Sequence, residues 1–175
     1  MKKSCKIAIT WDCNLDCSYC CNKLDAVQNK FQNSTLDEIL VQNYENISIT
    51  GGEIGICPEK LNNYLEILGK TKSKLWLYTN GRLMPQMLIR PERINGINIS
   101  CHNSISHSLL CVNQWEKYKD INIRLHIQDE KYDDYLISMQ KLIELYIPKQ
   151  NIKLWTLDKC FDNIEEDWYY ISGVN

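Results

Sequence analysis

The sequence contains no run of about 18 apolar residues, and its first residues show no signal-peptide pattern. We therefore expect a soluble, cytoplasmic protein without a membrane partner. The sequence also lacks a large excess of charge of either sign, since it has 20 Lys and Arg residues and 22 Asp and Glu residues, for a net charge of −2. This balance gives no electrostatic reason to expect nucleic acid as a partner, although it does not exclude a substrate of nucleotide size.

No linker rich in Gly, Ser or Pro divides the chain, and it contains no low-complexity tract. At 175 residues the chain has the length of one domain with a sizeable core, and two domains would be cramped. We expect residues 1–161 to form this core domain. Residues 162–175, which are acidic and aromatic, are expected to be a short C-terminal tail packed on the core.

The sequence is rich in cysteine, of which it contains nine residues. Because no export signal supports an oxidising compartment, clustered cysteines indicate metal binding rather than disulfides. Zinc is the weaker interpretation of the cluster. Cys17 and Cys20 form one CxxC pair, but no second pair follows it. The three histidines also lack the close spacing that is typical of zinc-binding histidines.

Cys13, Cys17 and Cys20 lie within eight residues, directly after a predicted strand at residues 6–11. A loop with this spacing can bring three sulfur atoms to one small inorganic centre. Thiolates are the usual ligands of iron–sulfur clusters, most of which are held by four cysteines. Three ligands would leave one iron open to another molecule. Chance spacing in a cysteine-rich chain is the alternative.

The spacing CxxxCxxC resembles the cluster loop of the radical S-adenosylmethionine (radical SAM) superfamily, and Tyr19, just before the third cysteine, also fits that loop. The resemblance implies a [4Fe–4S] cluster held by Cys13, Cys17 and Cys20. It also implies S-adenosylmethionine as a second cofactor, with its methionine moiety on the open iron. Cys21 directly follows Cys20, and we expect adjacent side chains to be poorly placed to hold one corner of a cluster together.

Strand-like segments alternate with helical ones along the chain. The expected strands are 6–11, 46–50, 74–78, 97–100, 121–127 and 151–157, and the expected helices are 36–44, 58–69, 104–118 and 133–145, with a poorer helix around Pro85 and Pro91. Six such units imply right-handed crossovers around a parallel sheet, so we expect an α/β fold. A flavodoxin-like open sheet fits the same pattern. The resemblance instead implies a partial (β/α)6 barrel of the radical SAM type.

Gly51, Gly52 and Glu53 follow the second predicted strand. In parallel sheets and barrels, chemistry gathers at the carboxyl ends of the strands, where the cysteine loop also lies. The three residues resemble the glycine pair that binds the amino group of the cofactor in radical SAM proteins. Residues without a Cβ let backbone carbonyls approach a ligand closely, and Glu53 adds an acceptor for an ammonium group. An ordinary Gly-Gly turn with a solvated glutamate is the alternative.

Other candidate residues follow the later strands. Asn80 lies in a Thr-Asn-Gly sequence that is similar to a family pattern after the third strand, although Asn-Gly is also a common turn. The resemblance implies that Ser100 and His102 hold the ribose or carboxylate of the cofactor, while a surface-loop histidine is the alternative for His102. His126 and Cys101 are candidate catalytic residues. A buried, satisfied histidine and a structural thiol are the alternatives for these two.

The resemblance implies an enzyme that reductively cleaves S-adenosylmethionine to a 5′-deoxyadenosyl radical, which abstracts hydrogen from a substrate. A flavodoxin- or ferredoxin-type reductant is the implied partner. We favour a small molecule or nucleotide as substrate. One alternative is an activase that generates a glycyl radical on a partner protein, for which residues 168–170 are the one aromatic stretch suited to docking. The other alternative is a non-enzymatic iron–sulfur protein for electron transfer or sensing.

Overall fold

The structure is a computed structural model. It describes residues 4–17, 20–101, 105–118, 121–127, 152–156 and 166–171. For residues 101, 105–109, 124–127 and 152–156 it describes the backbone alone. The helix expected at residues 133–145 lies outside this range.

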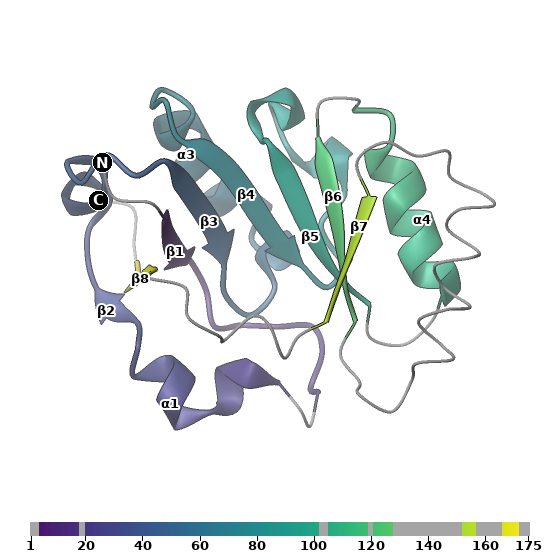
Figure 1. Cartoon of the computed structure of the whole chain (residues 1–175), viewed down its shortest axis with the longest axis horizontal. Coiled ribbons are helices and arrows are strands. Elements are labelled where there is room, and N and C mark those ends of the chain that lie inside the picture. Colours follow the sequence, from purple (N-terminus) through teal and green to yellow (C-terminus); the bar gives the residue numbers. More distant parts are fainter. Residues whose placement is uncertain are drawn as a thin grey trace.

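The described chain forms a parallel sheet (Figure 1). Its strands are β1 (Ser4–Ala8), β2 (Gln32–Asn33), β3 (Asn46–Thr50), β4 (Lys74–Thr79), β5 (Gly96–Cys101), β6 (Asn122–Ile127), β7 (Ile152–Thr156) and β8 (Asp167–Tyr170). They are arranged in the order β2-β8-β1-β3-β4-β5-β6-β7, and each neighbouring pair is parallel. All six strands expected from the sequence are present, so the α/β prediction is confirmed. In the described residues the sheet is open, with β2 and β7 at its edges.

Strands β2 and β8 were not expected from the sequence. Strand β8 pairs with β1, with Lys6 opposite Trp168, and its other edge pairs with β2. The segment Asp167–Tyr170, expected in a tail on the core, is therefore a strand inside the sheet. Its aromatic residues suit a strand, but four residues are too few for a clear alternating pattern.

The described helices are α1 (Asp25–Gln28), α2 (Leu36–Leu40), α3 (Pro58–Leu68) and α4 (Ile105–Trp115). Helix α2 begins at a capping box, in which the Glu38 amide donates to Thr35 Oγ1 and the Thr35 amide donates to Glu38 Oε2 at 2.9 Å. The helix expected around Pro85 and Pro91 is wrong. Each proline instead begins a single turn of 3₁₀-helix, because a proline inside an α-helix removes a backbone hydrogen bond.

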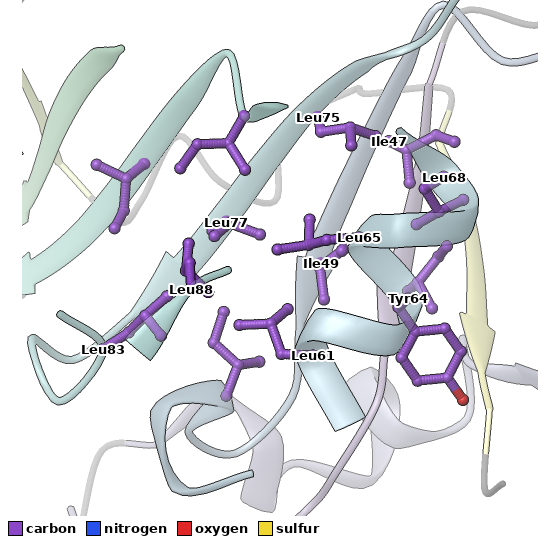
Figure 2. Packing of buried hydrophobic residues seen from close by; sticks show 14 of the residues in the cluster. Ile47, Ile49, Leu61, Tyr64, Leu65, Leu68, Leu75, Leu77, Leu83 and Leu88 are labelled. Atoms are coloured by element: carbon purple, nitrogen blue, oxygen red, sulfur yellow. The ribbon is translucent and has the colours of Figure 1, made fainter. Parts of the chain in front are cut away.

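Helices α2, α3 and α4 pack on one face of the sheet in a single hydrophobic core. Figure 2 shows how α3 covers β3 and β4. Alternate residues of these strands face the helix, where they meet residues spaced by one turn; the buried residues are Ile47, Ile49, Leu75 and Leu77 of the strands and Leu61, Tyr64, Leu65 and Leu68 of α3. Burying each of these side chains contributes roughly 1.5–3 kcal/mol.

The opposite face of the sheet is polar and aromatic, because the alternate strand positions there carry Lys6, Ser48, Trp76, Tyr78 and Asn98. The Lys6 ammonium lies 3.5 Å from Glu166 Oε2, 4.4 Å from the ring centre of Trp168 and 5.3 Å from that of Tyr78. The two faces of the sheet therefore differ sharply in chemistry. Among the described helices, none has the length and apolar character needed to span a bilayer.

Candidate functional site

The cysteine loop leaves the carboxyl end of β1, at the edge where the strand arrows end in Figure 1. Cys13 is exposed, Cys17 and Cys20 are half-buried, and all three are reduced cysteines. The amide of Cys20 donates to the Cys17 carbonyl at 3.3 Å, and the amide of Leu15 donates to Cys13 Sγ at 3.4 Å. The loop is thus turned back on itself between its first and third cysteines.

Partial burial raises the pKa of the Cys13 thiol, the hydrogen bond from the Leu15 amide opposes this effect, and the neighbouring Glu53, Cys20 and Cys17 raise the pKa further. Within the described residues, however, no three His, Cys, Asp or Glu side chains are arranged so that they could hold a metal ion. The donor chemistry fits an iron–sulfur cluster, because three reduced cysteines share one loop. The ligation itself stays a prediction.

Gly51 and Gly52 lie directly against the start of this loop. The amide of Gly52 donates to the Thr10 carbonyl at 2.7 Å, and the amide of Glu53 donates to the Asp12 carbonyl at 2.8 Å. A Cβ on Gly51, whose φ is +146°, would lie 2.1 Å from the Thr10 carbonyl oxygen. The glycines are therefore required for the close approach of two backbone segments, whereas the sequence suggested only an approach to a ligand.

The same segment also holds the far side of the cysteine loop. Asn22, two residues after Cys20, donates from Nδ2 to the Gly51 carbonyl oxygen at 2.6 Å. The residues just before and just after the three cysteines are thus bonded to one segment of three residues. This arrangement fixes both ends of the loop relative to the carboxyl end of β3.

Glu53 is completely buried, so the alternative of a solvated glutamate is wrong. Its Oε1 accepts hydrogen bonds from the Gly55 amide and from Thr79 Oγ1, each at 2.7 Å. Its Oε2 accepts one from the Asn80 amide at 2.6 Å. Burial raises the pKa of the carboxyl group, and the three hydrogen bonds oppose this effect. A carboxylate has about four acceptor positions, and these three donors occupy three of them.

Asn80 connects the end of β4 to the cysteine loop. Its Nδ2 lies 3.0 Å from Asn14 Oδ1 and 3.7 Å from Cys13 Sγ, and it donates to both atoms. Its backbone amide is the donor to Glu53 described above. The turn that follows is held by Thr79 Oγ1, which accepts from the Gly81 amide at 3.1 Å. Asn80 is therefore in contact with the other two predicted motifs.

The remaining predicted residues are less fully described. Ser100 lies in β5 two strands away from β3, and its backbone pairs with that of His126. The side chains of His126 and Cys101 lie outside the described part of the structure, as do all atoms of Tyr19 and His102. The structure thus brings Cys13, Gly51, Gly52, Glu53 and Asn80 together.

No protein-family model matches this chain, and no curated protein is significantly similar to it. The interpretation of the site therefore depends on its own residues and geometry. A surface cavity of about 380 Å³ lies elsewhere, between α3 and the segment that precedes β5. It is lined by Asn62, Leu65, Glu66, Lys70, Ile89, Arg90 and Arg93, so none of the predicted site residues contributes to it.

One group of residues beside the cysteine loop was missed by the sequence analysis. The rings of Trp11 and Tyr170 are stacked with centroids 5.1 Å apart, and Phe31 meets Trp11 edge-on at 5.0 Å. Phe31 in turn lies 4.9 Å from Trp168. The signal for this cluster was the spacing of Trp168 and Tyr170, because residues two apart in a strand lie on the same face.

Proposed function

We propose that this chain is a radical SAM enzyme that binds a [4Fe–4S] cluster and S-adenosylmethionine at the carboxyl edge of its sheet. One observation carries the proposal. Three segments that the sequence analysis selected separately, at Cys13, at Gly51–Glu53 and at Asn80, are joined by hydrogen bonds. Neighbouring parallel strands bring their following loops to one edge in any case, so the support comes from the direct hydrogen bonds of Asn80 to Cys13 and of Glu53 to Asp12 and Asn80.

The fold supports a partial (β/α)6 barrel rather than a flavodoxin-like sheet. Strands β1, β3, β4, β5, β6 and β7 follow one another across the sheet in the order of the chain. A doubly wound sheet reverses its direction at a switch point and carries helices on both faces. Among the described helices, α2, α3 and α4 pack on one face, and the described side chains of the opposite face are polar or aromatic, as expected for the outside and the inside of a barrel.

Cys13, Cys17 and Cys20 would hold three irons of the cluster, and Glu53 would receive the ammonium group of S-adenosylmethionine. When bound and reduced by a flavodoxin- or ferredoxin-type partner, this pair of cofactors supplies a carbon-centred radical. The chain's own residues bind and orient the cofactors and the substrate, and they exclude water from the site. Asn80 steadies the loop at Cys13. Contacts of Ser100 and His102 with the ribose or carboxylate, and catalytic roles for His126 and Cys101, remain part of the proposal.

Two observations support a small molecule or nucleotide as the substrate. The polar face of the sheet presents hydrogen-bonding groups together with Trp76 and Tyr78, which suits a ligand of this size. The aromatic residues Trp168 and Tyr170, which would have served to dock a partner protein, are instead packed on Phe31 and Trp11. A glycyl-radical activase would need another docking surface.

Anaerobic reconstitution with iron and sulfide tests the cluster. The proposal predicts about four irons per chain, with the cluster lost when Cys13, Cys17 or Cys20 is replaced by serine. Cys21→Ser is the matched control and should retain the iron, because it changes the adjacent thiol only. A content near eight irons, or a cluster that survives all three substitutions, would contradict the proposal.

A further inference from the structure

The cysteine loop belongs to the longer connection between β1 and β2, in which Trp11 and Phe31 lie near the two ends. Between these residues the chain contains all three predicted cluster ligands and α1. The two rings meet edge-on at 5.0 Å, with an angle of 88° between their planes. The connection is therefore closed at its base by one aromatic contact, in addition to the hydrogen bonds made by Gly51, Gly52 and Glu53.

Strand β8 completes this closure from the other end of the sequence. Tyr170 stacks on Trp11, with 20° between the ring planes, and Trp168 packs on Phe31. The two residues lie on the same face of β8, and each contacts one end of the connection. Lys30, next to Phe31, places its ammonium 5.2 Å from the ring centre of Trp168. The four rings form one continuous group, which we name the aromatic clasp (Trp11, Phe31, Trp168 and Tyr170).

Strand β8 is itself held by contacts that do not involve the loop. It is paired in register with β1. On its opposite face, Tyr169 packs on the core, and its hydroxyl lies 2.8 Å from that of the buried Tyr44. Tyr44 also donates to Asp167 Oδ2 at 2.5 Å. The strand is thus held in place independently of the loop, and it carries Trp168 and Tyr170 of the aromatic clasp.

We propose that β8 is a positioning element for the cysteine loop and that Tyr170 and Trp168 act through Trp11 and Phe31 to hold its two ends together. This inference rests on the proposed function, because it concerns the gathering of the three thiols. It assigns residues near the C-terminus to a site near the N-terminus. On this proposal β8 holds the two ends of the loop at one place, and the three thiols can converge on a metal only while this closure is intact.

Zn²⁺ affinity of the full-length chain under anaerobic, reducing conditions tests the proposal, because thiolates bind Zn²⁺ and its affinity depends on how well they are gathered. Tyr170→Leu should weaken Zn²⁺ binding by about two- to tenfold, which is the range that the loss of one aromatic ring contact gives. Tyr170→Phe keeps the ring and should restore an affinity within about twofold of the unchanged protein. Unchanged affinity in Tyr170→Leu would overturn the proposal.

Tyr169→Leu is the matched control, because it changes the neighbouring residue of the same strand on the face that packs on the core. It should lower stability towards denaturant and leave the Zn²⁺ affinity of the folded protein unchanged. Equal loss of affinity in both leucine variants would mean that strand stability alone is measured, and would also overturn the proposal. If Tyr170→Leu does not fold, Phe31→Leu takes its place, because Phe31 lies outside the strands. The same loss of Zn²⁺ affinity is expected for this variant.

This test does not depend on enzymatic activity. A protein that loses Zn²⁺ affinity as expected but fails to cleave S-adenosylmethionine supports the positioning role and contradicts the proposed function. A protein that cleaves the cofactor and whose Tyr170→Leu variant binds Zn²⁺ normally supports the proposed function and contradicts the positioning role.

Discussion

A Cβ on Gly52 would lie 2.0 Å from the carbonyl oxygen of Asp12, the residue just before the first cysteine of the loop. Real Cβ atoms do not approach backbone this closely, so any other residue at this position must move the loop or the strand end. Position 52 is thus coupled to the cysteines by backbone contact. The coupling needs no ligand, and it can be measured in the protein without cofactors.

We predict that Gly52→Ala displaces the cysteine loop. The free energy of unfolding should fall by about 1–3 kcal/mol, the usual cost of overpacking, and reconstituted iron should fall well below that of the unchanged protein. Gly96→Ala is the control, because Gly96 lies in β5, two strands away from β3, and its Cβ would meet the ring of Trp76 at 2.1 Å. The Gly96→Ala protein should take up as much iron on reconstitution as the unchanged protein, even if its free energy of unfolding is lower. Full iron incorporation in Gly52→Ala would show that the contact does not position the loop.

We predict that Asn80→Ala frees the start of the loop, because it removes the hydrogen bonds from Nδ2 to Asn14 and Cys13. The cost to stability should be about 1 kcal/mol. The rate at which a maleimide modifies the Cys13 thiol, followed by mass spectrometry, should rise. Asn62→Ala is the control, since Asn62 bonds to Met87 and Ile89 on the helix side of the molecule. Equal rates in both variants would speak against a role for Asn80 at the loop.

The raised pKa of Glu53 predicts that the stability of the protein depends on pH. Its pKa in the folded chain is raised above the ordinary value of 4.5, chiefly by burial. A raised carboxyl pKa contributes stability below pH 4.5, and this contribution is lost as the pH rises through the folded-state pKa. Compared with Glu53→Gln, the unchanged protein should therefore lose stability as the pH increases from about 4.5. Urea unfolding of both proteins across this range measures the difference. A gain in stability of the unchanged protein relative to Glu53→Gln as the pH rises would contradict the assigned direction.

Lys60 of α3 ties the ends of two strands to the helix layer. Its ammonium donates to the Ile9 carbonyl at 2.5 Å and contacts the Ile171 carbonyl at 3.4 Å, just after β1 and β8. Lys60→Met keeps the apolar stem and removes the donors, so we expect a loss of about 1.5–3 kcal/mol in the free energy of unfolding. Lys72→Met, on the exposed surface, should change it by less than about 0.5 kcal/mol. Similar values for the two variants would mean that the Lys60 contacts contribute little.

The sheet and the meeting of the three motifs could be predicted from sequence, because alternating βα units imply parallel strands whose carboxyl ends share one edge. The burial of Glu53 could not be predicted. Its donors on Thr79 and Asn80 lie 26 and 27 residues away, and their register depends on the pairing of β3 with β4. The place of β8 was missed for a similar reason, since its pairing with β1 joins opposite ends of the chain.

Cleavage of S-adenosylmethionine tests the central claim most directly. The reconstituted protein is incubated anaerobically with dithionite and S-adenosylmethionine, and 5′-deoxyadenosine is measured by chromatography. The proposed function predicts that this product forms only with reductant, is lost in Cys13→Ser and persists in Cys21→Ser. A protein that holds about four irons and yet releases no 5′-deoxyadenosine would contradict it, and would instead favour an iron–sulfur protein for electron transfer or sensing.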